Sequence, residues 1–148
     1  MLSTPILAPG SDAALRREME VNVHGPLALA RAFAPILAAN GGGAIVNVLS
    51  VVSWFVLPFN ATYCVSKHAA LAVTDALRLD LAGQGTRVVG VHAGFIDTDM
   101  AAGIDRPKPP PREIAERALD GIRNGTDRVL ADDRAREVWA ELGRGRER

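Results

Sequence analysis

The sequence predicts an α/β fold in which helices cover both faces of an open, doubly wound parallel sheet. Residues 44–49 form a short run of almost continuous apolar, β-branched side chains, and residues 87–92, with valine at 88, 89 and 91, form a second run of the buried type. Such runs are typical of strands covered on both faces. Segments with helical periodicity precede, separate and follow these runs, and glycines stand at the junctions. Because helices and strands that alternate through short connections form right-handed crossovers, the strands are expected to be parallel.

The first predicted helix follows a loop at residues 1–10, which contain two prolines and a glycine. Ser11 or Asp12 can cap the helix, and apolar side chains recur at near-helical spacing over residues 15–37. The Asn-Gly-Gly-Gly sequence at 40–43 ends the helix, because glycine readily adopts the left-handed conformation of a C-cap. The first predicted strand begins directly after it.

The other elements are assigned in the same way, from apolar periodicity and from the glycines and prolines that interrupt it. They are a loop at 50–60, a helix at about 62–81 that glycines at 83 and 85 end, a strand at 87–92, a proline-containing loop at 93–111, a helix at 112–124, a strand at 128–130 and a helix at 134–142. About three strands with flanking helices are therefore expected in a single domain.

Composition excludes several classes of protein. The 148 residues include 17 basic and 17 acidic side chains, whereas a nucleic-acid-binding protein normally has a basic excess. One cysteine excludes a disulfide framework and fits the reducing cytoplasm. The N-terminus shows no secretory signal pattern, and the apolar stretch at 48–59 is shorter than the about 20 residues that cross a membrane. A cytoplasmic protein that binds neither membranes nor nucleic acids is expected.

Tyr63 and Lys67 are four residues apart in the long predicted helix and so share one of its faces. An ammonium group beside a phenol favours the phenolate, so the pair predicts a lowered pKa for Tyr63. A tyrosine with a lowered pKa serves as a general acid or base near neutral pH. Taken alone, however, this spacing is more often that of a half-buried tyrosine beside a solvated lysine.

Four further residues lie where chemistry is expected. Ligands of open parallel sheets bind beyond the carboxyl ends of the strands, and Ser50 follows the first strand while Gly94 and Thr98 follow the second. Asn22 lies inside the first helix, and Pro26, four residues on, has no N–H, which predicts a kink and a carbonyl available to water. Turn formation or a purely structural kink also explains each residue when it is taken singly. The three histidines have no metal-ligand spacing and fit surface or hydrogen-bonded core positions.

Taken together, these residues resemble the short-chain dehydrogenase/reductase family. The resemblance rests on Asn22 in a helix, the Ile-Val-Asn-Val-Leu-Ser sequence at 45–50, and the motifs Tyr63-x-x-x-Lys67 and Ala93-Gly94-x-x-x-Thr98. Their order and spacing agree with the family's pattern at every step. The resemblance implies a Rossmann-type fold and hydride transfer between NAD or NADP and an alcohol or ketone.

The resemblance also implies a role for each matching residue. Tyr63 is the catalytic acid or base, and Lys67 lowers its pKa and holds the nicotinamide ribose. Ser50 orients the substrate carbonyl, and Asn22 holds a water molecule of a proton relay. Thr98 contacts the nicotinamide carboxamide, and the implied cofactor-binding set is Tyr63, Lys67, Gly94, Ile96 and Thr98.

The chain also departs from the family's pattern. Ala93 stands where the family usually has proline, and Ser53 where it often has glycine. The family's N-terminal strand, glycine-rich phosphate loop and helix are not found in the sequence, nor is the acidic or basic residue after them that selects NAD or NADP. Residues 1–148 are therefore interpreted as the C-terminal catalytic portion of a truncated domain. The strand at 44–49 is expected to have an open apolar edge.

Three functions remain open after this interpretation. The chain is the C-terminal part of an oxidoreductase, a noncatalytic remnant that only associates, or a related epimerase or dehydratase. Apolar residues in the loops favour a hydrophobic alcohol or ketone as the substrate: Trp54, Phe55, Val56, Leu57 and Phe95. The resemblance further implies a homo-oligomer that packs through the helix at 62–81, on a surface of Ala69, Ala72, Ala76 and Leu79.

Overall fold

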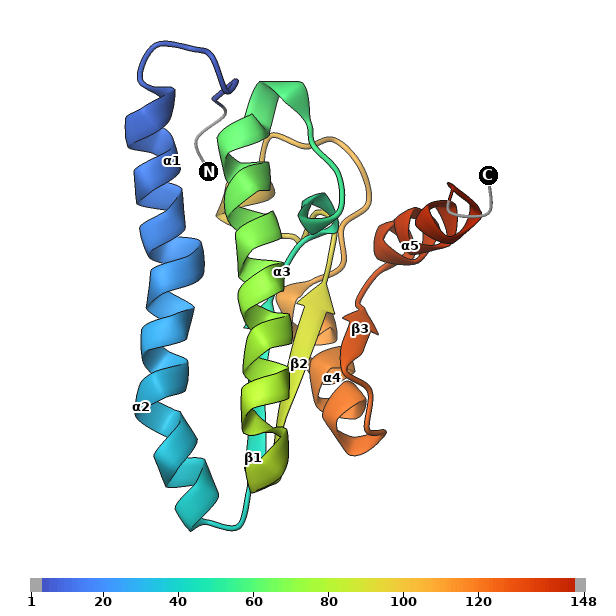
Figure 1. The fold of residues 1–148 in the computed structure, drawn as a ribbon. Coiled ribbons are helices and arrows are strands. Elements are labelled where there is room, and N and C mark those ends of the chain that lie inside the picture. The colour runs from blue at the N-terminus through green and yellow to red at the C-terminus, as the bar shows by residue number, and fades with distance from the viewer. Residues whose placement is uncertain (1–3, 146–148) are drawn as a thin grey trace.

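The computed structural model describes residues 4–145, which form a three-stranded parallel sheet flanked by helices (Figure 1). The strands β1 (Gly43–Val48), β2 (Thr86–His92) and β3 (Arg128–Leu130) pair in the order β1–β2–β3. The predicted α/β class, the parallel pairing and the positions of all three strands are confirmed, with strand ends shifted by at most one residue.

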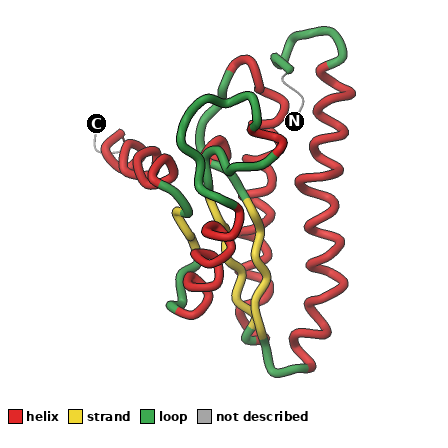
Figure 2. The backbone as a smooth tube through the Cα atoms, turned by 180° about the vertical axis from the view of Figure 1, so that it is seen from behind, coloured by secondary structure: helices red, strands yellow, loops and turns green. Residues whose placement is uncertain are grey.

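Helices cover both faces of this sheet, as the two opposite views of Figures 1 and 2 show. Helices α2 (Gly25–Ala39) and α3 (Ala61–Leu81) pack on one face, and α1 (Ser11–Met19) lies beside α3. Helix α4 (Pro111–Arg123) covers the opposite face, and α5 (Asp133–Gly145) follows β3. The doubly wound arrangement predicted from the sequence is therefore present.

The central strand β2 supplies side chains to both halves of the core. Val88 packs against α2 and α3, whereas Val89 and Val91 pack with Ile114 of α4 and with Val129 of β3. These opposite directions follow from the alternation of side chains along a strand. Residues 88–91 of β2 are valine and glycine, as expected for a strand that is covered on both faces and paired on both edges.

Helices α1 and α2 are joined without a break by a π-helical turn, Glu20–His24 (Figure 1). In this turn the N–H of Gly25 donates to the carbonyl of Glu20, five residues earlier. The wider turn accommodates Pro26, which has no N–H to continue the ordinary helical pattern. Sequence periodicity predicts one helix here but not the π turn, and this turn is the one that carries Asn22.

The connection between α2 and β1 requires glycine at position 42. Gly42 has a φ of +109°, and a Cβ there would lie 2.4 Å from the carbonyl oxygen of Gly85. We expect Gly42→Ala to lower the free energy of unfolding by more than about 2 kcal/mol, because backbone strain and a clash with backbone act together. Urea unfolding measures the effect, with Gly83→Ala as the control since its Cβ would meet open space. Equal stabilities of the two variants would contradict this explanation.

Candidate active site

Ser50 lies directly beyond the carboxyl end of β1, where it is the N-cap of a 3₁₀ turn, Val51–Ser53. Its Oγ accepts a hydrogen bond from the N–H of Val52 at 3.3 Å, and its own N–H donates to Ser53 Oγ at 3.3 Å. The N–H of Val51 donates to the carbonyl of Ala93 at 3.0 Å, which continues the β1–β2 pairing past the strand ends. These bonds fix the place of the Ser50 hydroxyl oxygen, and its hydrogen can donate to a ligand.

Tyr63 and Lys67 lie in the first two turns of α3, at the same end of the sheet. The Nζ atom of Lys67 is 5.7 Å from the centroid of the Tyr63 ring and donates to the carbonyl of Val48 at 3.1 Å. The Tyr63 ring packs in an apolar cluster with Val51 of the turn that follows Ser50. The structure therefore brings the Tyr63–Lys67 pair beside the end of β1 that carries Ser50.

The pKa of Tyr63 is raised to about 12 in this structure, whereas the sequence predicts a lowered value. Burial of the phenol is the largest cause, and the Cys64 thiol and the Glu18 carboxylate add to it. Burial also lowers the pKa of Lys67. The prediction of a lowered Tyr63 pKa is therefore wrong, because burial of the phenol disfavours its charged form.

Asn22 connects the π-helical turn to the turn of α3 that carries Tyr63. Its Nδ2 donates to Ser66 Oγ at 2.9 Å, and Ser66 Oγ donates to the carbonyl of Tyr63 at 2.8 Å. Asn22 and Lys67 also line one groove of the surface. Asn22 thus lies near the pair that the sequence selected, although its role in holding a water molecule stays a prediction.

Gly94 is held by Asp132, a residue that the sequence analysis did not select. The Gly94 N–H donates to Asp132 Oδ2 at 2.7 Å, and Oδ1 accepts from the N–H of Ala135 at 2.7 Å. A Cβ on Gly94 would lie 3.1 Å from Cβ of Arg134, so close packing with α5 also favours glycine here. The signal in the sequence is an aspartate directly before a helix, since aspartate is a preferred N-cap.

The remaining cofactor-binding candidates lie in the loop after β2. Ile96 is partly buried against the core cluster between the sheet and α4. Thr98 is exposed, and its hydroxyl donates to the carbonyl of Ile96 at 3.3 Å. The loop also contains a short 3₁₀ turn, Asp99–Ala101, which the sequence analysis did not predict. Contacts of Ile96 and Thr98 with a cofactor stay predictions.

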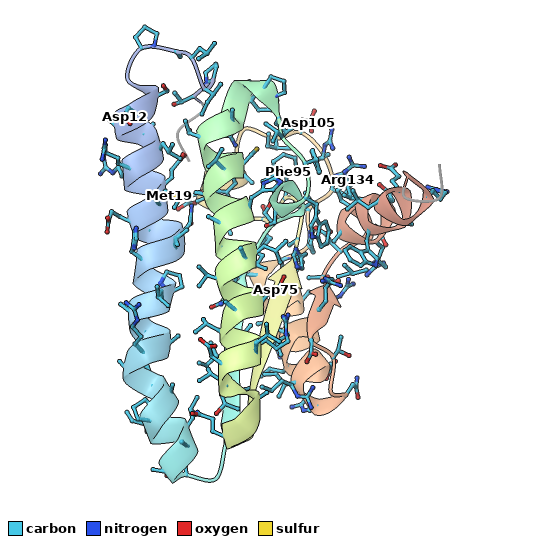
Figure 3. The ribbon with its side chains drawn as sticks, viewed as in Figure 1. Asp12, Met19, Asp75, Phe95, Asp105 and Arg134 are labelled. Atoms are coloured by element: carbon cyan, nitrogen blue, oxygen red, sulfur yellow. The ribbon has the colours of Figure 1, made fainter. Side chains whose placement is uncertain are left out.

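The apolar residues expected to line a substrate site divide into two groups. Trp54, Phe55 and Leu57 are partly buried. They pack against an apolar cluster that includes Ala135 and Val138 of α5. Val56 remains 54% exposed and Phe95 37% exposed, so these two side chains are the accessible part of the set. Phe95, labelled in Figure 3, lies in the loop after β2, and the guanidinium of Arg106 lies 5.8 Å from the centroid of its ring.

Glu18 is a second residue that sequence reasoning missed. Its side chain is buried, and neither carboxylate oxygen has a hydrogen-bond partner among residues 4–145. It lies one helical turn before Asn22 and therefore on the same side of the helix. That spacing is the signal that would have found it.

Comparison with known proteins decides the family. The sequence pattern of the family described as short chain dehydrogenase matches residues 5–109, which is more than half of the chain. The chain belongs to this family. It is 35% identical over 133 residues to 1-deoxy-11-beta-hydroxypentalenate dehydrogenase of Streptomyces exfoliatus, a match that covers 89% of this chain and 44% of the relative. It is 38% identical over 115 residues to 2-(R)-hydroxypropyl-CoM dehydrogenase of Xanthobacter autotrophicus, covering 77% and 45%.

Solved structures of family members agree with this fold. A short chain dehydrogenase from Burkholderia cenocepacia J2315, in complex with NADP, superposes with a TM-score of 0.91 and is 39% identical, covering 98% of this chain and 61% of that one. A short-chain dehydrogenase from Sphingobium yanoikuyae, in complex with NADPH, has a TM-score of 0.69 and 27% identity, covering 85% and 52%.

This member of the family spans about half the length of the curated relatives it matches. The family membership confirms the resemblance on which the site residues were selected. Within residues 4–145, none of the helices has the length and apolar character needed to cross a membrane.

His92 gives this dehydrogenase-family chain a predicted pH dependence of stability. Burial lowers the pKa of His92 from 6.5 to about 4, against the raising effect of the Ser50 carbonyl bond. As pH falls, His92 is therefore protonated in the unfolded chain before it is protonated in the folded one. Its contribution to the free energy of unfolding is fully present above pH 6.5 and decreases as pH falls toward 4. We expect this group to cost about 3 kcal/mol of unfolding free energy by the end of that interval.

Urea unfolding at pH values from 7 to 4 measures this dependence. His92→Gln should have a flatter profile than the wild type, because glutamine does not titrate. His24→Gln serves as the control, since His24 is exposed. A profile for His92→Gln as steep as that of the wild type would rule out His92 as the source.

Proposed function

We propose that this chain is the catalytic portion of an NAD(P)-dependent oxidoreductase that interconverts an alcohol and a ketone. Residues 1–148 would form the C-terminal part of the catalytic domain. The observation that carries the proposal is the position of Lys67. Its ammonium lies over the Tyr63 ring and donates to the Val48 carbonyl, and so it joins the proposed acid or base to the strand end that carries Ser50.

The side chains have distinct proposed roles. Tyr63 would give a proton to the carbonyl oxygen of a ketone, or remove one from an alcohol, through its hydroxyl. Ser50 would donate a hydrogen bond to the same oxygen, because its Oγ already accepts from Val52 and keeps its hydrogen. Asn22 would hold a water molecule of a proton relay in the groove that it lines with Lys67.

The residues present fit the nicotinamide half of the cofactor. The ammonium of Lys67 lies at the carboxyl end of β1, and the loop that contains Gly94, Ile96 and Thr98 follows the carboxyl end of β2, where such folds bind ligands. NAD or NADP would supply the hydride acceptor or donor when bound. Among residues 4–145, no glycine-rich connection leads from a strand into a helix N-terminus, the usual place of the pyrophosphate.

Two titrations and one assay test this proposal. We expect the chain to bind reduced nicotinamide mononucleotide and NADPH with similar affinity, because residues 4–145 offer proposed contacts to the nicotinamide half alone. Much tighter binding of NADPH would contradict this part of the proposal. With NAD or NADP, we expect turnover of secondary alcohols to increase with the length of their apolar chains, since Val56 and Phe95 are accessible. Absence of turnover with every alcohol and ketone would contradict the proposed reaction.

A second candidate function, association without catalysis, is favoured by the free edge of β1. Within the part of the chain that the structure describes, residues 4–145, only one edge of β1 is paired, and Val48 is 57% exposed. A groove of about 490 Å³ follows the strand and is lined by apolar side chains that include Leu29 and Phe33. Unpaired edges readily add a further strand. If the chain binds a protein but no nicotinamide, this function replaces the first.

We also propose a homo-oligomer that packs through α3, within a protein located in the cytoplasm. Ala72, Ala76 and Leu79 are exposed on α3, and Leu79 is 80% exposed. Ala69 is half-buried, so the exposed surface is narrower than the one expected from the sequence. Small side chains allow two helices to approach closely.

A charged substitution on this surface tests the oligomer. We expect Ala76→Arg to convert a dimer or tetramer into a monomer, because an arginine cannot be packed between closely spaced helices without a partner. Sedimentation velocity measures the change. Ala115→Arg is the matched control, since Ala115 is exposed on α4. A monomeric wild type, or an unchanged oligomer in Ala76→Arg, would contradict the proposed surface.

A further inference from the structure

His92 is a buried histidine that the proposed reaction does not use. It is the last residue of β2 and is 1% exposed. Its own carbonyl accepts a hydrogen bond from the N–H of Ala131 at 2.8 Å, so its backbone is part of the β2–β3 pairing. The backbone that carries the imidazole is therefore held in place beside the end of β1.

The ring of His92 contacts the backbone of Ser50. Its Nδ1 atom lies 3.3 Å from the Ser50 carbonyl oxygen. A carbonyl oxygen only accepts hydrogen bonds, so the contact is favourable when Nδ1 carries the hydrogen. In a neutral imidazole, that leaves Nε2 without one. The geometry thus requires one particular tautomer of His92.

The Ser50 carbonyl accepts from two directions. The N–H of Ser53 donates to it at 3.0 Å, and the His92 ring approaches from the neighbouring strand. The first bond belongs to the 3₁₀ turn itself, whereas the second joins this turn to the core. The orientation of the Ser50 peptide, and with it the direction of the Ser50 Oγ, depends on both.

Stacked rings hold the imidazole in place. The ring of Trp54 lies parallel to it, with centroids 4.0 Å apart and an interplanar angle of 19°. Trp139 of α5 lies 5.0 Å from Trp54, and the guanidinium of Arg128 lies 4.1 Å from the Trp139 ring. Trp54 follows Ser50 by four residues, so the turn that His92 bonds also supplies the ring that covers it.

We propose that His92 is a positioning residue for Ser50, which it holds through Nδ1–H and the stack of Trp54 and Trp139. Histidine is suited to this position because it combines a flat ring, which stacks, with a nitrogen donor, which fixes the carbonyl. The proposal rests on the proposed role of Ser50 in the reaction. Its structural part is tested without any measurement of activity.

The tautomer of His92 is the first test. Long-range ¹H–¹⁵N spectra of the ¹⁵N-labelled wild-type chain near neutral pH show which ring nitrogen of each of the three histidines carries the hydrogen. His92→Asn identifies the His92 signals by their loss. We expect hydrogen on Nδ1 and a bare Nε2 for His92. Hydrogen on Nε2 alone would overturn the proposal, because Nδ1 could then not donate to Ser50.

Two substitutions separate hydrogen bonding from ring packing. His92→Asn keeps a nitrogen donor close to the place of Nδ1 and loses the ring, whereas His92→Phe keeps a stacking ring and loses the donor. In alcohol oxidation we expect His92→Phe to lower kcat about tenfold with the KM for cofactor unchanged, and His92→Asn to retain kcat within about threefold. His24→Gln, an exposed position, controls for histidine loss.

The outcomes distinguish this inference from the proposed function. Equal losses of kcat in His92→Phe and His92→Asn, or no loss in either, would overturn the positioning role. A wild type without turnover contradicts the proposed function, and the tautomer of His92 then decides the structural inference alone.

Discussion

Tyr63→Phe is expected to lower turnover by about 10²- to 10⁴-fold while the fold remains intact, because it removes only the hydroxyl that would transfer the proton. The ring keeps its packing against Val51 and the other residues of its apolar cluster. The rate of nicotinamide reduction, measured by absorbance, gives kcat, and circular dichroism reports the fold. Near-normal turnover would remove Tyr63 from the role of acid or base.

Thr62→Val is the matched control for this prediction. Thr62 directly precedes Tyr63, is fully buried, and its hydroxyl has no hydrogen-bond partner among residues 4–145. The substitution therefore also removes one hydroxyl from the first turn of α3, without a change in shape. Turnover of Thr62→Val should equal that of the wild type. A similar loss in both variants would point to a disturbed helix rather than to lost chemistry.

Asp132→Ala is expected to lower the free energy of unfolding by about 2–4 kcal/mol, because two hydrogen bonds to a buried carboxylate are lost together. Asp132 is 8% exposed and accepts from the N–H groups of Gly94 and Ala135, both at 2.7 Å. Without it, the Gly94 N–H loses its partner and α5 loses its cap. Urea unfolding measures the change.

The neighbouring aspartate is the natural comparison. Asp133 is exposed and pairs with Arg136 on the surface of α5. Asp133→Ala should therefore change stability little, since exposed ion pairs contribute little. If both variants are equally destabilised, the effect comes from the composition of the helix start and not from the two bonds of Asp132.

The strands were predictable because a strand that is buried on both faces has apolar residues at consecutive positions. Residues 88–91 are valine and glycine, and the valine side chains pack against α2 and α3 on one side of β2 and against α4 on the other. The π-helical turn, Glu20–His24, was not predicted, because Pro26 removes the usual N–H partner of the Asn22 carbonyl whether the helix kinks or widens. Trp54 was assigned to a substrate lining, but its ring stacks on His92.

The sequence by itself determined the α/β class, the order of the elements and the short-chain dehydrogenase/reductase motifs around Tyr63, Lys67 and Ser50. These follow from periodicity and spacing, which are properties of the chain taken one segment at a time. Only the tertiary structure decided which groups surround those residues. The raised pKa of Tyr63 depends on burial. The bond between Gly94 and Asp132 and the contact of His92 with Ser50 join residues that are 38 or more positions apart in the sequence. Burial and long-range contacts arise only when the strands are brought side by side.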